Sequence, residues 1–290
     1  MQADMRLLKL RNAGMFSNVN EVVEQLRRAC RGNYQFVIDW SDSPYSDPGW
    51  SGDPWDQYFH PCFTKDGIDA SSANDCLSGF PVLPGGVEVA CARDNIITPR
   101  EEDGVCAPLL LPLDRHAAHQ LIKQYLIPKD NVIREINSFE AAYFDGHVIG
   151  LHIRGPGRTD GGVPMMRRAF GADNEVPLKP FCAAVDREIK THPNAMIFVC
   201  SDSSAVISSI TTRYGERVVC WPALRSEFGE MHAQHPNNRG QSFSGYRLGL
   251  DVLVEAYLLA RTSFFVHGNS NVANYVLCLN PKIRSTYILA

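Results

Sequence analysis

The sequence predicts an α/β protein whose strands form parallel sheets. Near the start, the apolar segments 5–10 and 36–40 resemble strands, and a segment of helical periodicity separates them. Further along, strand, polar turn and helix follow one another three times, which is typical of parallel sheets with crossover helices. With 290 residues, 44% of them apolar, the chain can form two domains. We place these domains at 1–145 and 146–290, with the boundary at Asp145-Gly146.

The first half contains three predicted helices. The first ends near Cys30, with Asn18 or Asn20 as its N-cap and an apolar face that includes Leu26. The other two helices are expected at 117–126 and 131–144. Together with the two strands, the first helix gives a β-α-β start, which favours a parallel sheet.

Residues 41–105 differ from the rest because they are rich in proline, glycine, serine and aspartate. Such a long segment is usually functional or disordered, and its aromatic residues argue against disorder. These aromatics could stack on sugar rings, or they could simply attach a long loop to the domain. They are Tyr45, Trp50, Trp55, Tyr58 and Phe59.

The second half alternates regularly between strands and helices. Strands are expected at 148–154, 196–200, 217–221 and 263–267, and helices at 181–190, 205–214, 249–261 and 272–279. Polar turns follow three of these strands. In open α/β sheets, ligands bind at the carboxyl ends of the strands, so these turns are the candidate ligand sites.

The first of these turns follows the strand in VIGLHIRGPGRTD. Its alternation predicts that His152 and Arg154 share one face of the strand and reach its end together. A guanidinium beside a glycine-rich turn suits a diphosphate, although Arg154 could instead form a structural salt bridge. His152 could be a core residue, a support for Arg154 or a phosphate donor. The turn is not a Walker P-loop, and a plain dinucleotide fold is a weaker alternative because G-x-G-x-x-G is missed by one position.

The second turn, SDSS, follows strand 196–200 and opens a helix. Asp202 or Ser203 could supply the N-cap, and Asp202 and Ser203 could also bind a ribose or a base. Glu255 lies within the strongly apolar helix 249–261. It is therefore a candidate for a partly buried acid that reaches the same edge.

The third turn carries Asn269, Ser270 and Asn271 at the start of the last helix. Side-chain donors, unpaired backbone N–H groups and the positive end of a helix all suit phosphate. Capping alone explains one of these residues but not the run of three.

Composition narrows the function classes. The net charge of −4 gives no basic field for nucleic acid. The nine cysteines are scattered without any C-x-x-C motif, which suggests reduced thiols. No apolar run reaches the length of a membrane span. We therefore expect a cytoplasmic protein, free or peripheral at a membrane.

Taken together, the segments HIRGPG, FVCSDSSAVISSI and EAYLLARTSFFVHGNSNVANYV resemble, in order and spacing, the three motifs of the α1,6-fucosyltransferase superfamily. The resemblance is greatest to the NodZ-like rhizobial nodulation fucosyltransferases of glycosyltransferase family 23. FVIDWSDSPYSDPGW is also similar to the N-terminal half of that group. The resemblance covers about half to two thirds of the chain.

This resemblance implies a GT-B fold, with two Rossmann-like domains that face a cleft and the nucleotide sugar in the C-terminal one. It also implies an inverting, metal-independent transfer of fucose from GDP-fucose to a hydroxyl of an oligosaccharide or glycoconjugate, with no cofactor. By the same resemblance, Arg154 binds the donor diphosphate and Asp202 matches the acid of the second motif. Ser270 and Asn271 match the phosphate- or sugar-binding end of the third, and Glu255 matches an acid that recognises guanine.

The chain departs from this pattern in two places. Many relatives have two adjacent arginines in the first motif, whereas Gly155 follows Arg154 here, and Arg158 is a candidate to replace the missing charge. Asp160 is the nearest candidate for the base, and Asp39 or Asp42 in the first half are weaker ones. The Gly155 departure keeps open another donor, such as UDP-xylose. A rival of a different class is a non-catalytic glycan-binding module that uses the aromatic loop Tyr45–Phe59.

Overall fold

The computed structural model describes residues 4–32, 34–62, 96–97, 112–154, 177–226, 244–268 and 270–288. The chain forms two compact units, Met1–Asp130 and Asn131–Ala290. Helix α4 (Asp130–Tyr143) groups with the second unit, whereas the predicted boundary near residue 145 put it with the first. The physical reason is aromatic packing, since the ring of Phe139 on α4 lies 5.6 Å from that of Phe198 and 5.4 Å from that of Trp221.

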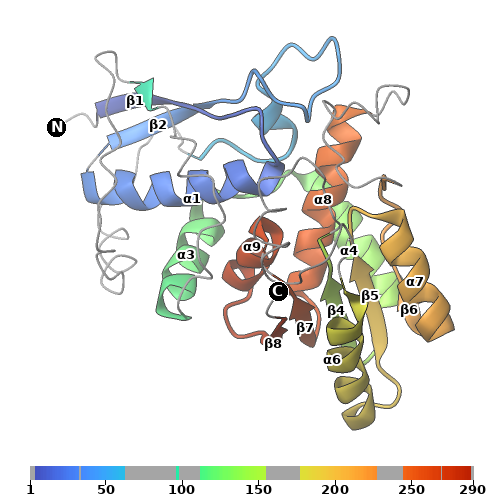
Figure 1. Ribbon diagram of the computed structural model, residues 1–290. Coiled ribbons are helices and arrows are strands. Elements are labelled where there is room, and N and C mark those ends of the chain that lie inside the picture. Colours follow the sequence, from blue (N-terminus) through green and yellow to red (C-terminus); the bar gives the residue numbers. More distant parts are fainter. Residues whose placement is uncertain are drawn as a thin grey trace. The chain divides into compact units, whose positions relative to one another are not determined.

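The first unit contains a parallel sheet with the strand order β2-β1-β3. Its strands are β1 (Asp4–Lys9), β2 (Tyr34–Asp39) and β3 (Ile96–Ile97). Helix α1 (Met15–Gly32) connects β1 to β2 and runs alongside the sheet, and α3 (Pro112–Tyr125) packs against α1 (Figure 1). The predicted β-α-β start is confirmed, while the short strand β3 has no clear signal in the sequence.

The N-cap predicted for α1 is wrong. The helix begins at Met15, so both Asn18 and Asn20 lie inside it. Asn18 is fully buried and binds the preceding turn, because its Nδ2 donates to the Arg11 carbonyl (2.9 Å) and its Oδ1 accepts from the Arg11 N–H (3.1 Å). The polar side chain therefore fixes the loop before the helix rather than the helix end.

The second unit contains a five-stranded parallel sheet with the order β6-β5-β4-β7-β8. The strands are β4 (Val148–His152), β5 (Met196–Cys200), β6 (Val218–Val219), β7 (Phe264–His267) and β8 (Arg284–Tyr287). The helices besides α4 are α6 (Leu178–Thr191), α7 (Ser204–Tyr214), α8 (Gly245–Ala260) and α9 (Asn271–Leu279). The predicted alternation of strands and helices is confirmed, and β8 is an additional strand.

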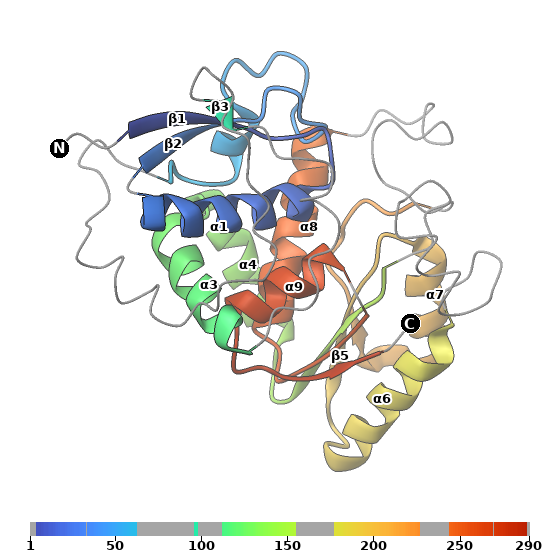
Figure 2. The same ribbon diagram turned by 60° about the vertical axis from the view of Figure 1, so that its left-hand side comes forward.

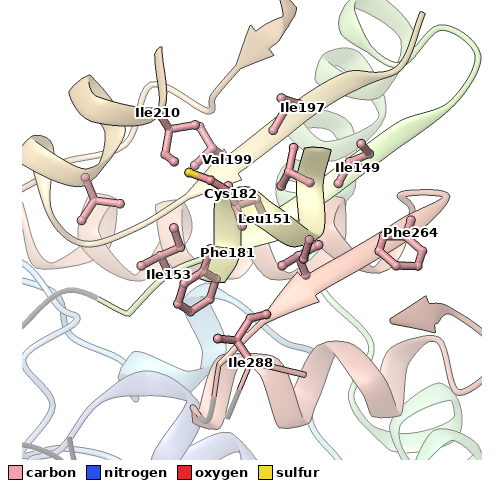
Figure 3. Close-up of a cluster of buried hydrophobic side chains, with 14 of the residues drawn as sticks. Ile149, Leu151, Ile153, Phe181, Cys182, Ile197, Val199, Ile210, Phe264 and Ile288 are labelled. Atoms are coloured by element: carbon pink, nitrogen blue, oxygen red, sulfur yellow. The ribbon is translucent and has the colours of Figure 1, made fainter. Parts of the chain in front are cut away.

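Strand β4 contacts two helices, α6 and α8, both of which are labelled in Figure 2. Ile149 and Leu151 belong to one apolar cluster with Phe181 of α6 and Ile210 of α7 (Figure 3). Gly150 faces the α8 side, where a Cβ atom would lie only 2.7 Å from Oγ1 of Thr262, just beyond α8. This glycine therefore permits the close approach of the segment between α8 and β7.

Two further findings concern the cysteines and the helices. Cys62, Cys182, Cys200 and Cys220 are free thiols. No helix within the described ranges is both long enough and apolar enough to cross a membrane.

Candidate functional site

The sheet of the second unit reverses its winding direction between β4 and β7. From β4, the chain adds β5 and then β6 on one side, and it then returns to place β7 and β8 on the other side. Ligands of open α/β sheets bind outside the carboxyl ends of the strands at such a switch point. His152 ends β4 and is the register partner of His267, which ends β7, so the candidate site lies beside these two residues.

His152 contacts the start of helix α9 at this point. Its Nε2 lies 3.0 Å from Oγ of Ser270, and both residues are buried. Ser270 is also the N-cap of α9, because its Oγ accepts from the Ala273 N–H at 3.0 Å. Burial, reinforced by the charge of Arg154, lowers the pKa of His152 to about 3. His152 is therefore a neutral hydrogen-bonding group that fixes Ser270, and it is not a cation for phosphate.

Arg154 projects from the end of β4 and forms an ion pair with Asp202, which follows β5. About a third of the Arg154 side chain is exposed, while Asp202 is less accessible. Strands β4 and β5 are adjacent and parallel, so the pairing follows from the topology. Arg154 thus forms a salt bridge, which was the alternative interpretation of this residue from the sequence. The pairing also places a charged guanidinium at the carboxyl end of β4, two residues beyond His152, which contacts Ser270.

The turn after β5 is held in place by a second segment. Ser203 is the N-cap of α7, with its Oγ accepting from the Val206 N–H, so of the two predicted caps the structure selects Ser203 over Asp202. Ser226 bonds on both sides of Ser203, because its N–H donates to the Asp202 carbonyl and its carbonyl accepts from the Ser204 N–H, each at 2.9 Å. Because Ser203 supplies the cap, Asp202 pairs with Arg154 instead.

Glu255 is buried on α8 and pairs with Arg225. Burial raises the pKa of Glu255, and Arg225 opposes that rise. Arg225 also donates to the carbonyls of Ser201 and Trp221. Glu255 is therefore linked through one guanidinium to the turn that carries Asp202, which makes Arg225 a part of the site.

Sequence reasoning missed Arg225, and it also missed Asp251. The Asp251 carboxylate accepts from Trp221 Nε1 (2.9 Å) and from the Leu224 N–H (3.0 Å), and it forms an ion pair with Nε of Arg247 at 2.8 Å. A signal existed, since two acids four residues apart in an apolar helix need partners when they are buried. It indicates that a partner exists but does not identify Arg225, which lies in the loop after β6.

Several predicted site residues cannot be compared with the structure. Gly155, Arg158, Asp160 and Asn269 lie outside the described residues, so the base and the replacement charge stay predictions. Asn271 opens α9 directly after Ser270, as predicted.

The aromatic residues after β2 are mostly core residues of the first unit. Tyr45, Trp55, Tyr58 and Phe59 are buried, and Trp55 stacks on Phe59 with ring centroids 4.5 Å apart. Trp50 differs from them because it is 49% exposed. The four buried rings therefore attach the loop to the first unit, and they are not accessible to a sugar.

Of the two weaker base candidates, Asp42 is exposed. Asp39 accepts a hydrogen bond from the Ser41 N–H at 3.0 Å. Hydrogen bonds from the Ser41 side chain and backbone lower the pKa of Asp39, which makes it a poorer general base.

No protein-family model matches this sequence, and no curated protein matches it. The structure is nevertheless similar to solved structures of fucosyltransferases. The NodZ fucosyltransferase from Bradyrhizobium is 17% identical with a TM-score of 0.55, over 95% of this chain and 92% of that chain. A NodZ α-1,6-fucosyltransferase soaked with GDP-fucose is 18% identical with a TM-score of 0.54, over 96% and 93%. POFUT1 in complex with GDP is 12% identical with a TM-score of 0.53, over 98% of both chains.

The fold is GT-B. The predicted fold class is therefore confirmed, with two α/β units of which the second contains the candidate site. At sequence identities of 11–18%, the similarity to these solved structures establishes the fold and nothing beyond it.

Proposed function

We propose that this protein is a glycosyltransferase that moves fucose from GDP-fucose to a hydroxyl of a glycan. One observation carries the proposal: Arg154 and the Ser270-capped start of α9 lie at the switch point of a GT-B sheet. A helix N-terminus beside a guanidinium suits the diphosphate of a nucleotide sugar. The solved relatives of this fold include complexes with GDP and GDP-fucose, which supports the choice of donor.

In this proposal, Arg154 binds the donor diphosphate. The guanidinium that pairs with Asp202 in the free protein has further N–H groups, so it can bind phosphate oxygens while Asp202 orients it. The N–H groups at the start of α9, after Ser270, supply further donors. His152 acts through Ser270, because a neutral imidazole with a pKa of about 3 adds no charge.

Glu255 would recognise the guanine base. Guanine presents N–H donors on its Watson–Crick edge, which a carboxylate accepts well. Arg225 would hold this carboxylate in place, since it binds Glu255 and two carbonyls of the neighbouring segments.

The proposed reaction inverts the anomeric carbon. An acceptor hydroxyl attacks from the face opposite the diphosphate, the bond to the diphosphate breaks, and GDP leaves with the bonding electrons. Arg154 and the α9 N-terminus would stabilise the charge that develops on GDP, without a metal ion at this edge. Asp160 would take the acceptor proton, and the first unit would bind the acceptor. The free thiols among the described cysteines support a cytoplasmic location.

Nucleotide binding by the Arg154→Ala variant tests the proposal. Isothermal titration calorimetry should show GDP binding that is stronger than UDP binding. Hydrogen bonds to charged groups contribute about 1.5–3 kcal/mol, so Arg154→Ala should weaken GDP binding roughly 10- to 100-fold. Arg213→Ala is the matched control. Arg213 lies in the last turn of α7 and pairs with Asp186 of α6, so this variant should leave GDP binding unchanged.

Three results would count against parts of the proposal. Equal GDP affinity in wild type and Arg154→Ala would remove Arg154 from the site. A preference for UDP would keep the transferase and change the donor, for example to UDP-xylose. Binding of glycans without any nucleotide would favour the glycan-binding module. With GDP-fucose as the donor, transfer to an acceptor panel should fall about 100- to 1,000-fold in Arg154→Ala.

A further inference from the structure

A cluster of metal-ligand side chains lies at the opposite edge of the second unit's sheet. His147 directly precedes β4, and Glu188 and His192 are four residues apart at the end of α6. The His147 carbonyl accepts from the Met196 N–H (3.0 Å), which places the cluster where β4 and β5 begin. At about 3.3 Å per residue, the five-residue strand β4 separates this edge from the candidate nucleotide site by about 16 Å.

The three side chains converge on a small volume. Oε1 of Glu188 lies 3.1 Å from Nε2 of His147 and 3.5 Å from Nε2 of His192. The two imidazole rings stack with centroids 3.7 Å apart and an angle of 8° between their planes. One ligand atom from each residue lies within 4.8 Å of the others. Two ligands of one tetrahedral Zn²⁺ ion lie about 3.4 Å apart. An imidazole binds the ion in the plane of its ring, so the two rings would rotate out of their stack to complete a site.

Hydrogen bonding does not account for this arrangement. Nε2 of His147 and Oε1 of Glu188 are close, yet the contact lacks hydrogen-bond geometry. Both buried atoms are without a hydrogen-bond partner within the described part of the chain. Such buried polar atoms are costly.

The charges of the cluster also favour a cation. Glu188 is only 8% exposed, and the nearest arginine contact is from Arg284, 3.9 Å away on a side chain that is 67% exposed, so this pair is weak.

We propose that His147, Glu188 and His192 bind a divalent transition-metal ion, with Zn²⁺ as the best match. Two imidazoles and one carboxylate are a common ligand set for Zn²⁺, and water would occupy the fourth position. The ion would join the start of β4 to the end of α6. The site is independent of the proposed sugar transfer because it lies at the other edge of the sheet.

The test is a Zn²⁺ titration of the full chain at neutral pH after removal of bound metal. A Cys220→Ser background removes an exposed thiol that would also bind zinc. Competition with a chromophoric chelator should show one tight site per chain. His192→Gln changes a half-exposed side chain, so it should fold normally and weaken that site about 10-fold or more. His116→Gln changes an exposed histidine on α3 and is the matched control.

Cobalt provides a second readout. Co²⁺ bound by the cluster should give a visible absorption band that His192→Gln weakens and His116→Gln leaves unchanged. The proposal is overturned if no saturable binding occurs at micromolar zinc. It is also overturned if His192→Gln binds zinc as tightly as its parent, because the ligands would then lie elsewhere. GDP affinity should be the same with and without zinc, so this test is separate from that of the proposed function.

Discussion

Ser270→Ala should destabilise the protein more than an ordinary loss of a helix cap. The Ser270 hydroxyl caps α9 through the Ala273 N–H and also contacts Nε2 of His152, each at 3.0 Å. Loss of the cap costs about 1 kcal/mol. An unpaired polar atom on buried His152 costs about 1–3 kcal/mol. Together they predict a loss of about 2–4 kcal/mol in the free energy of unfolding.

Ser203→Ala provides the matched control for this prediction. Ser203 is also an N-cap, on α7, and is buried to nearly the same extent, 5% exposed against 6% for Ser270. Its hydroxyl contacts the Val206 N–H at 3.4 Å, so its removal should cost only about 1 kcal/mol. Urea denaturation followed by circular dichroism measures both variants. Equal losses in the two variants would refute the idea that His152 depends on Ser270.

Two further predictions concern titration and packing. Unfolded histidine binds its proton near pH 6.5, whereas folded His152 does so only near pH 3. The unfolded state therefore holds more protons between these values, and stability should fall as the pH decreases through this window. The loss of stability attributable to His152 between about pH 6.5 and 5 is about 2 kcal/mol. The stability of His152→Asn, measured by urea denaturation, should therefore depend less on pH than that of the wild type. Parallel pH profiles of the two proteins would contradict this prediction. Trp55→Ala should lower the free energy of unfolding by about 3–5 kcal/mol because Trp55 is buried in the first unit. Trp50→Ala should change it by no more than about 0.5 kcal/mol. Similar losses in the two variants, measured by urea denaturation, would show that Trp55 is not a core residue.

The sequence predicts the second unit well because its signals are local. The strands 148–154 and 196–200 are found at Val148–His152 and Met196–Cys200, where buried apolar runs end in polar turns. The candidate residues of three turns were predicted to share one edge, and the parallel sheet brings Arg154 to Asp202 and His152 to Ser270.

The sequence is less informative where partners are distant. Arg225 lies in the loop after β6, and its contact with Glu255 bridges thirty positions along the chain. No periodicity encodes such a pair. Strand β8 carries exposed polar residues at an edge of the sheet, so its burial pattern does not resemble that of a strand core. Trp55 shows a different difficulty, because an aromatic residue beside aspartates fits both a core and a sugar-binding surface until its burial is known.

The central position of β4 has a consequence for dynamics. All five of its residues are buried, and it is hydrogen-bonded to β5 on one side and to β7 on the other. Its amides should therefore exchange with solvent only when the whole second unit opens. His152 and Arg154 are attached to the part of the unit with the slowest motion. The conformational entropy of ordering these groups is lost during folding, so an arriving ligand does not have to order them again.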